Sequence, residues 1–371
     1  SLAVDLLDAI GAVEFVGVST VLPESLEQRL GELGDAVAKF MRSPDALPDV
    51  EGAAQQVLAH QMPPNEHPGP ECARMVARLC RREAMSGAAL PIADLVRDYV
   101  SNGAWEDWAR RALRGARPEK LARAVTKLLD RVATHRMASD EAFAATLAQT
   151  AAIGDVPTGM MPIESALHKI VAPLAQTNPV LMVVMDGMSQ DDYLAIAESM
   201  IHRGWSSWSR AGLPDALLAT TPSVTECSRA SLLAGRLTRG AASQEKQTFA
   251  QHEDLKRASR VSKPPLLLHK AGLEHSHQLT PEAANAIAEP EQRVVGLVIN
   301  AIDDTLAKSE QVRIGWTLES IPLLAEVLEQ ARRAGRTVVI TSDHGHVLER
   351  QSTMRPDGEG ERWRRVGPPV E

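Results

Sequence analysis

The chain contains the stretch Arg336-Thr-Val-Val-Ile-Thr-Ser-Asp-His-Gly-His346, in which a short apolar run leads into an aspartate and two histidines. The run that ends at Ile340 has the length and β-branched composition of a buried parallel strand. Open α/β sheets bind their ligands beyond the carboxyl ends of such strands. Carboxylates and imidazoles are both good ligands for divalent metals of zinc type. The stretch therefore predicts an α/β sheet with two metal ligands, Asp343 and His344, at its edge.

Two other apolar runs also end in acidic residues. Val180–Met185 leads into Asp186, and the run 294–300 leads into Asp303 and Asp304. Because the carboxyl ends of parallel strands meet at one edge of a sheet, we expect these carboxylates to share one metal site with the pair above. A simpler alternative is that each aspartate only caps the turn or helix that follows its strand.

Composition and charge narrow the class of protein. A chain of 371 residues with 44% hydrophobic and 24% charged residues is typical of a soluble globular protein of two or three domains. The net charge of −8 gives no general case for nucleic-acid binding. The three cysteines, Cys72, Cys80 and Cys227, are sparse and unpatterned, which favours a reducing compartment. No signal peptide and no run of about 18 apolar residues is present, so we expect a cytoplasmic protein with no membrane span.

The first 150 residues predict an α-helical domain, because apolar residues recur at helical spacing between breaks rich in proline and glycine. Helices are expected at 22–33, 52–61, 70–84, 91–101, 104–113, 118–134 and 139–151. The segment Gly154-Asp-Val-Pro-Thr-Gly159 is a domain boundary in this interpretation. The predicted domains are therefore 1–154, which is α-helical, and 155–371, which is α/β.

The second domain alternates strands and helices, as a mostly parallel sheet flanked by helices does. Strands are expected at 180–185, 215–220, 265–268, 294–300 and 336–341. Helices are expected at 161–174, 190–203, 226–235, 281–288 and 317–333, and the polar segment 237–262 is expected to be a loop. Since the chain starts at Ser1 without Met and ends about one element after the metal motif, we expect a fragment of a longer protein, truncated at its C-terminus.

A threonine and an arginine near the start of one predicted helix suggest phosphate chemistry. Thr225 would lie among the unpaired amides at the positive end of the helix dipole, where phosphate binds well. A hydroxyl beside a metal at such a place can also be ionised and act as a nucleophile. Arg229, one turn further on, would be placed to clamp a phosphate with two N–H groups. The alternatives are a simple N-cap for Thr225 and a structural ion pair for Arg229.

Three further polar residues are candidates for supporting roles. His346 follows the Asp343-His344 pair by two residues and is expected to orient a carboxylate ligand. His269 and Lys270 end a short apolar run, where they would contact a substrate phosphate or, for His269, the metal. A solvated pair at the edge of the sheet is the alternative for these two.

Two surface features have a weaker claim to function. The basic residues between Arg110 and Arg131 form a helical face that would suit a nucleic acid or a partner protein, but such a face is usually just solvated. Aromatic residues that could stack on bases are missing there apart from Trp105 and Trp108, which lie just before this segment, and this weakens the nucleic-acid interpretation. His275 and His277 have a two-residue spacing that is a weak metal signal in an expected loop.

The order of these residues resembles the alkaline phosphatase superfamily. That superfamily has an aspartate after a strand, a Ser or Thr nucleophile at a helix start, a glycine ten residues later (here Gly235), an Ile-Asp motif and an Asp-His pair. Within it, the chain most resembles the PglZ proteins of BREX (phage growth limitation) phage-defence systems. The resemblance covers about 175–350 and rests on Val184-Met-Asp-Gly-Met-Ser189, Thr225-Glu-Cys-Ser-Arg-Ala-Ser-Leu-Leu-Ala-Gly235, Leu268-His-Lys270, Val298-Ile-Asn-Ala-Ile-Asp-Asp304 and Thr341-Ser-Asp-His-Gly-His346.

The resemblance implies a metal-dependent phosphoester hydrolase that works with other proteins of a phage-defence system. One metal ion would be held by Asp186, Thr225, Asp343 and His344, with Thr225 as the nucleophile. Asp303 would belong to a second metal ion. Zinc is the expected metal, as one or two ions, with manganese or magnesium as alternatives. The substrate would be a phosphoester, with nucleic acid among the candidates.

The chain also departs from the pattern of alkaline phosphatase. The histidine expected four residues after Asp303 is replaced by Ala307, and no histidine follows His346. The second metal would then need a ligand from a segment missing from this fragment, or the site would hold one metal only, or the fragment would be incomplete and inactive. A silent scaffold that keeps a structural metal site is the main alternative function. A mutase or a sulfatase-like enzyme is a third, although Cys227 lacks the Cys-x-Pro-x-Arg string of sulfatases.

Overall fold

The computed structural model describes residues 2–61, 67–85, 92–209, 215–259, 263–275, 278–307 and 315–346. The chain divides into two compact units, Ser1–Gly154 and Asp155–Glu371, and each is described by itself. Within the described ranges, no helix has both the length and the apolar character needed to cross a membrane. His277 lies outside the described residues.

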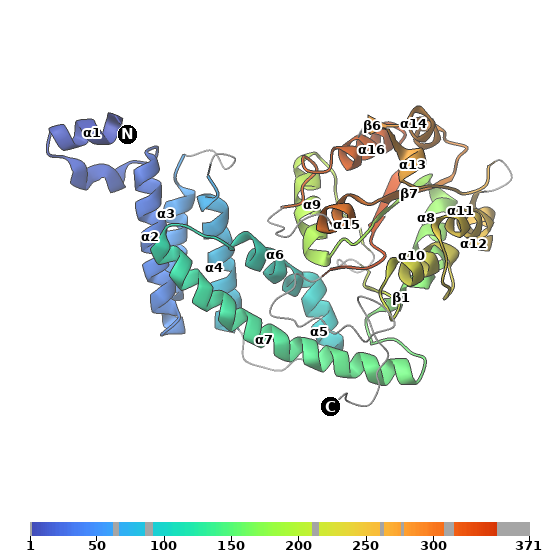
Figure 1. Ribbon diagram of the computed structural model, residues 1–371, viewed down its shortest axis with the longest axis horizontal. Coiled ribbons are helices and arrows are strands. Elements are labelled where there is room, and N and C mark those ends of the chain that lie inside the picture. The colour runs from blue at the N-terminus through green and yellow to red at the C-terminus, as the bar shows by residue number, and fades with distance from the viewer. Residues whose placement is uncertain are drawn as a thin grey trace. The chain divides into compact units, whose positions relative to one another are not determined.

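The first unit is built from helices (Figure 1). Its core forms where α2 packs against α3, α4 and α7. Leu26, Leu30, Leu33 and Val37 recur at helical spacing on α2 and are fully buried, so one apolar face of this helix supplies much of the core. The helices are α1 (Leu2–Ala9), η1 (Val13–Val18), α2 (Pro23–Phe40), η2 (Pro44–Ala46), α3 (Leu47–Leu58), α4 (Gly69–Met85), α5 (Ile92–Asp98), η3 (Tyr99–Gly103), α6 (Ala104–Ala112) and α7 (Glu119–Ala152).

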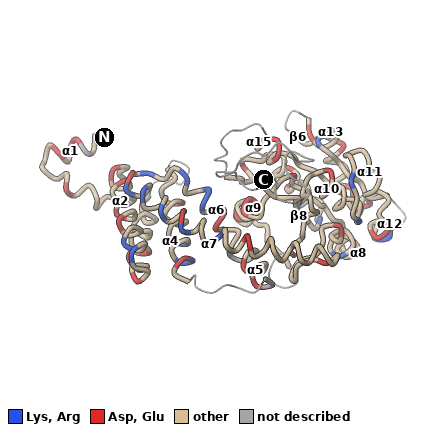
Figure 2. The backbone as a smooth tube through the Cα atoms, turned by 60° about the horizontal axis from the view of Figure 1, so that its bottom comes forward, with Lys and Arg blue, Asp and Glu red and all other residues tan. Residues whose placement is uncertain are grey.

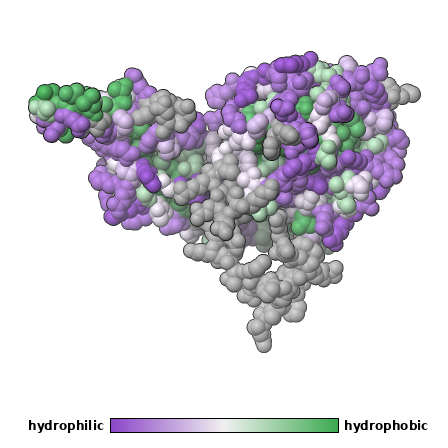
Figure 3. Space-filling view, turned by 45° about the horizontal axis from the view of Figure 1, so that its top comes forward, coloured by the Kyte–Doolittle hydropathy of each residue, from purple (hydrophilic) through white to green (hydrophobic). Residues whose placement is uncertain are grey.

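The surface of this unit carries both charged and apolar side chains. Part of the predicted basic face is paired with acids, since Arg110 pairs with Asp107, Lys120 with Asp35 and Arg123 with Glu119. Figure 2 shows basic and acidic segments interspersed along the helices. At the start of the chain, by contrast, large apolar side chains of α1 and η1 such as Leu2 and Phe15 are exposed (Figure 3).

The second unit has a four-stranded parallel sheet with the order β4-β7-β2-β8. The strands are β2 (Val180–Met185), β4 (Leu266–Leu268), β7 (Val294–Ile299) and β8 (Thr337–Thr341). Every residue of β2 and β7 is buried, which explains why both strands read as unbroken apolar runs.

Helices cover both faces of this sheet. Leu181, Val183 and Met185 belong to a core shared with α9, α13, α14, α15 and α16, whereas Val180, Met182 and Val184 face α8, α10, α11 and α12. Figure 1 shows these two groups of helices on opposite sides of the strands. The remaining elements are β1 (Met161–Pro162), η4 (Ile163–Ser165), η5 (Leu167–Val171), α8 (Ala172–Thr177), α9 (Gln190–His202), β3 (Leu217–Leu218), α10 (Thr225–Ala234), α11 (Ala242–Gln251), α12 (Glu253–Ser259), α13 (Lys270–Leu273), β5 (Glu274–His275), β6 (Gln278–Leu279), α14 (Pro281–Ala288), α15 (Ala301–Leu306) and α16 (Pro322–Arg333).

The predicted fold class, an α/β parallel sheet flanked by helices and preceded by a helical region, is confirmed. Four of the predicted strands form the sheet. The fifth, 215–220, was wrong in its place, because only β3 forms there and it pairs with β1. The predicted helix 161–174 likewise starts as strand β1 and becomes helical only from Ile163.

Two other predictions were wrong about helix boundaries. The segment 237–262, expected to be a loop, contains α11 and α12. Phe249, Leu255 and Ala258 are buried there in the core beside the sheet, so a few apolar side chains anchor helices that are otherwise mostly polar. The separate helices at 118–134 and 139–151 are one helix of 34 residues, α7. No glycine or proline interrupts the sequence between them, so the helix continues.

Candidate metal centre

The sheet places three polar residues side by side at its carboxyl edge. Strand β2 lies between β7 and β8, and Met185 at the end of β2 is opposite Ile299 at the end of β7. Asp186, which follows β2, and Asn300, which follows β7, are therefore neighbours. Asp343 follows the other neighbouring strand, β8, by two residues. All three strands are parallel, so their ends converge at one edge.

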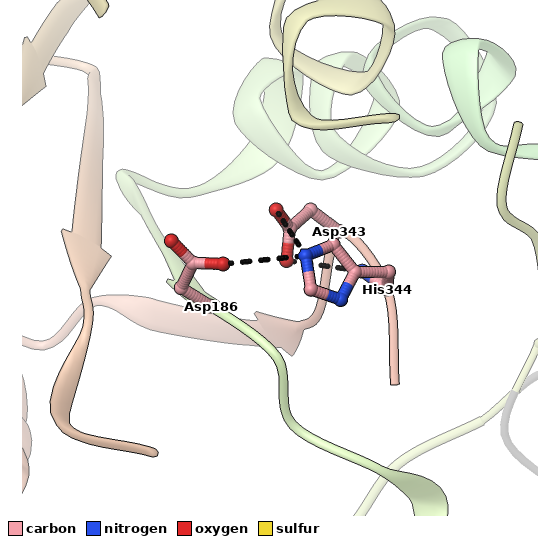
Figure 4. Close-up of side chains that lie close together, drawn as sticks. All are labelled: Asp186, Asp343 and His344. Carbon is pink, nitrogen blue, oxygen red and sulfur yellow. Dashed lines mark hydrogen bonds and ion pairs between the residues drawn. The ribbon is translucent and has the colours of Figure 1, made fainter. Parts of the chain in front are cut away.

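Asp186, Asp343 and His344 form a group that could hold a metal ion, with one ligand atom of each within 4.8 Å of the others (Figure 4). The Nε2 atom of His344 lies 3.6 Å from Oδ1 of Asp186 and 3.7 Å from Oδ2 of Asp343. The Nδ1 atom of His344 is 3.1 Å from the carbonyl oxygen of Gly345, which can only accept. Nδ1 therefore donates to this carbonyl, which orients the ring so that Nε2 faces the two carboxylates.

The two oxygens of each carboxylate differ in their hydrogen bonds to the described residues. Oδ2 of Asp186 accepts from Arg229 and Asn300, and Oδ1 of Asp343 accepts from the backbone amides of Gly187 and His344. The other oxygens, Oδ1 of Asp186 and Oδ2 of Asp343, are buried and have no hydrogen-bond partner among the described residues. Buried carboxylate oxygens without partners are costly. Since both lie near the same nitrogen of His344, a divalent cation would satisfy all three atoms, and the residues fit a metal.

The electrostatics of the group also favour a cation. Burial raises the pKa of Asp186 to about 7, and the negative charge of Asp343 adds to this, while Arg229 acts in the opposite direction. Negative charge is therefore held at a place where burial disfavours it. A positive ion would reverse this effect.

Thr225 lies next to this group. It is the first residue of α10, and its Oγ1 is 3.0 Å from Nε2 of His344. The same helix is tied to the end of β8, because the hydroxyl of Ser228 donates to the carbonyl oxygen of Asp343. The start of α10 is thus fixed where a hydroxyl and the three ligand groups meet.

Arg229 is buried one turn further along α10. Its Nη1 donates to Oδ2 of Asp186 at 2.6 Å, and its Nε lies 3.2 and 3.3 Å from the two carboxylate oxygens of Glu245. The structure thus places it in two ion pairs.

Asp303 lies beside the group but is not one of its three members. It is in the first turn of α15 and covers Gly187, where an added Cβ would be 3.5 Å from the Cβ of Asp303. Gly187 also has a positive φ of 73°, so glycine suits this turn after β2. The charge of Asp303 contributes to the raised pKa of Asp186, so the two carboxylates are near each other.

The other candidates contact residues outside this group of three. Nδ1 of His346 is 2.8 Å from the carbonyl oxygen of Gly187, the residue after Asp186. Nε2 of His269 is 3.3 Å from Glu245, and burial lowers the pKa of this imidazole to about 4, so it is neutral. Lys270 is exposed to solvent and pairs with Asp304 at 2.6 Å.

Three residues of this site were missed by the sequence analysis. Asn300 ends the run 294–300, but its place beside Asp186 follows from the pairing of β7 with β2, which the sequence does not display. Glu245 lies in α11, inside the segment expected to be a loop, so nothing pointed to it. Ser228 was visible in the motif around Thr225 but carried no separate signal.

Comparison with known proteins identifies the family of this unit. Residues 167–364, just over half of the chain, match the family model of the BREX system PglZ alkaline phosphatase-like domain. A search of curated proteins found no match. The match includes every residue of the group described above and confirms the resemblance drawn from the sequence motifs. The chain therefore belongs to the PglZ family of BREX systems, with an alkaline phosphatase-like domain that follows a helical region.

Proposed function

We propose that this protein is a metal-dependent phosphoester hydrolase of phosphatase or phosphodiesterase type. One observation carries the proposal: the hydroxyl of Thr225 lies 3.0 Å from the nitrogen of His344 that also faces the unpartnered oxygens of Asp186 and Asp343. A nucleophile and a set of metal ligands in one place are what phosphoryl transfer requires. Membership of an alkaline phosphatase-like family supports the same chemistry.

The metal would be held by Asp186, Asp343 and His344. Two carboxylates and one imidazole suit zinc, and manganese or magnesium would be accepted with more water ligands. When bound, a divalent cation would lower the pKa of an adjacent hydroxyl and neutralise charge on a phosphoryl group. Asp303, which packs against Gly187 and whose charge reaches Asp186, stays our candidate for a second ion.

The proposed hydrolysis has two steps. Thr225 Oγ1 attacks phosphorus, a bond to threonine forms, and the bond to the ester oxygen breaks. The hydroxyl proton passes to water, and the departing alkoxide takes a proton from water. A second water then cleaves the phosphothreonine and restores the hydroxyl. The first amides of α10 favour the negative phosphoryl oxygens during both steps.

The family also supports a place in phage defence. We propose that the partners are other proteins of the same defence system and that the protein works in the cytoplasm. Its three cysteines, Cys72, Cys80 and Cys227, are sparse and unpatterned, which supports a reducing compartment. Nucleic acid is one candidate for the phosphoester substrate.

Substitution of Thr225 tests the proposal. We expect Thr225→Ala to keep its zinc but to hydrolyse a generic aryl phosphodiester or monoester at least about 10³-fold more slowly, since the nucleophile is gone. Thr225→Ser, which keeps a hydroxyl, should retain part of the activity. Thr126→Ala, at an exposed position of α7, is the matched control and should match the wild type.

Two results would count against the proposal. If Thr225→Ala hydrolyses the ester at the wild-type rate in the presence of zinc, Thr225 is not the nucleophile. A wild-type chain that binds no metal and hydrolyses neither ester would favour an interaction scaffold without catalysis, an alternative favoured by Ala307 at the position of an expected histidine.

A further inference from the structure

Two oxygens of one carboxylate are treated differently in this site. Oδ2 of Asp186 accepts two hydrogen bonds, from Arg229 at 2.6 Å and from Asn300 at 2.8 Å. Oδ1 accepts none from the described residues, although it is just as deeply buried, and it points toward His344. The carboxylate is therefore held in one orientation, with Oδ1 available to a metal.

Arg229 is in turn held by a second acid. Glu245, on the neighbouring helix α11, is only 2% exposed and lies 3.2 and 3.3 Å from Nε of Arg229. The result is a buried row of ion pairs, Glu245–Arg229–Asp186, that links α11, α10 and the end of β2. Asn300, which follows β7, donates a hydrogen bond to the same oxygen of Asp186 from the side of the sheet.

The contact with Glu245 accounts for the single hydrogen bond that Arg229 donates to Asp186 among the described residues. A guanidinium beside a single carboxylate prefers to bind both of its oxygens. Here Glu245 holds Nε of Arg229 while Nη1 donates to Oδ2 of Asp186, so the guanidinium is fixed between two acids and makes no hydrogen bond to Oδ1. Without Glu245, Arg229 would be able to turn and cover Oδ1 as well.

Stability alone is a weak reason for such an arrangement. A buried ion pair costs about as much desolvation as it returns in attraction, and apolar replacements of similar volume are often neutral. A precise orientation of a metal ligand is a better reason, because partners of metal ligands typically change metal affinity by about 10- to 100-fold.

We propose that Glu245, Arg229 and Asn300 are positioning residues that keep Oδ1 of Asp186 free for the metal, and that Arg229 does not clamp substrate phosphate. The inference rests on the metal site of the proposed function. It assigns Arg229 a role different from the phosphate contact expected from the sequence.

The test is zinc affinity in the full chain, measured by competition with a chromogenic chelator. We expect Glu245→Gln, Arg229→Lys and Asn300→Ala each to weaken zinc binding by about 10- to 100-fold. The matched controls are Glu319→Gln and Arg203→Lys, which alter an exposed Arg–Glu pair of the same unit and should leave zinc affinity unchanged. Thermal unfolding of each metal-free variant identifies any that fails to fold. Asn300→Ala leaves no charge unpaired, so it carries the test if Arg229→Lys is unfolded.

Inorganic phosphate separates a positioning role from a phosphate clamp. If Arg229 is a positioning residue, Arg229→Lys weakens zinc binding, and at saturating zinc its affinity for phosphate is within about twofold of wild type. If it is a clamp, zinc affinity is unchanged and phosphate binding weakens by at least about tenfold, in line with a lost charge-assisted contact. The second result overturns the inference.

The outcomes also separate this inference from the proposed function. A wild-type chain that binds one zinc ion, with the three variants binding equally well, overturns the inference alone. A wild-type chain that binds no zinc overturns the proposed function and the positioning role with it.

Discussion

At the scale of single residues, the site depends on where charge is buried. Asp186 and Asp343 are 2% and 0% exposed, and Arg229 is the cation that contacts Asp186. Burial and the neighbouring carboxylate raise the pKa of Asp186 from 3.8 to about 7. In the metal-free protein, the folded state therefore binds this proton more tightly than the unfolded state does.

This difference predicts how the stability of the metal-free protein varies with pH. Below pH 3.8 Asp186 is protonated in both states and carries no penalty, and the penalty grows until it is complete above about pH 7. Between about pH 5 and pH 7.5 we expect this group to lower the free energy of unfolding by about 2 to 3 kcal/mol. Urea unfolding at several pH values in the presence of a chelator measures this change in the free energy of unfolding.

The comparison with Asp186→Asn isolates the contribution of this one group, because other carboxyl groups also titrate. The variant cannot ionise at this position, so its stability should fall less over the same pH range. Equal pH dependence in the variant and the wild type would show that Asp186 is not destabilised by its surroundings.

At the scale of elements, close approach of two helices in the first unit depends on a glycine. A Cβ at Gly34 of α2 would lie 2.7 Å from the backbone nitrogen of Leu121 on α7. We expect Gly34→Ala to lower the free energy of unfolding by about 1–3 kcal/mol, because backbone cannot move aside easily. Gly52→Ala on α3, where nothing lies within 4 Å, should instead be neutral or stabilise by up to about 1 kcal/mol. Denaturant unfolding of both variants checks the pair, and equal effects would contradict it.

A second element-scale contact holds the start of β8. The guanidinium of Arg336 is buried and donates to backbone carbonyls at the end of α14 and in the following turn, including those of Ala286, Glu289 and Gln292. Replacing it leaves several buried carbonyl oxygens without donors.

We therefore expect Arg336→Met to lower the free energy of unfolding by about 3–5 kcal/mol. Arg333→Met, which removes an exposed pair with Glu329, should cost less than about 0.5 kcal/mol. A cost below about 1 kcal/mol for Arg336→Met would show that other donors replace it.

Prediction from the sequence succeeded where the signal was local. The runs 180–185 and 294–300 are apolar throughout because both faces of their strands are buried, and β2 and β7 formed there. It failed in 237–262, where a few apolar residues decide the structure, and at Glu245 and Asn300, whose roles depend on which elements become neighbours. Register and helix packing set those neighbours, and a single sequence does not display them.

At the scale of the whole molecule, all the proposed metal ligands belong to the unit Asp155–Glu371. A ligand stabilises the folded unit that binds it. Zinc should therefore slow amide hydrogen exchange in β2, β8 and the start of α10, and leave exchange in α2 and α3 of the first unit unchanged. Hydrogen exchange with and without zinc checks this, and protection confined to the first unit would contradict it.

The most direct test of the central claim is a crystal structure of the zinc-soaked protein with anomalous data at the zinc edge. The account predicts an anomalous peak about 2.0–2.2 Å from Oδ1 of Asp186, Oδ2 of Asp343 and Nε2 of His344, with the hydroxyl of Thr225 beside it. No peak at this position, or zinc bound only by other side chains, would contradict it.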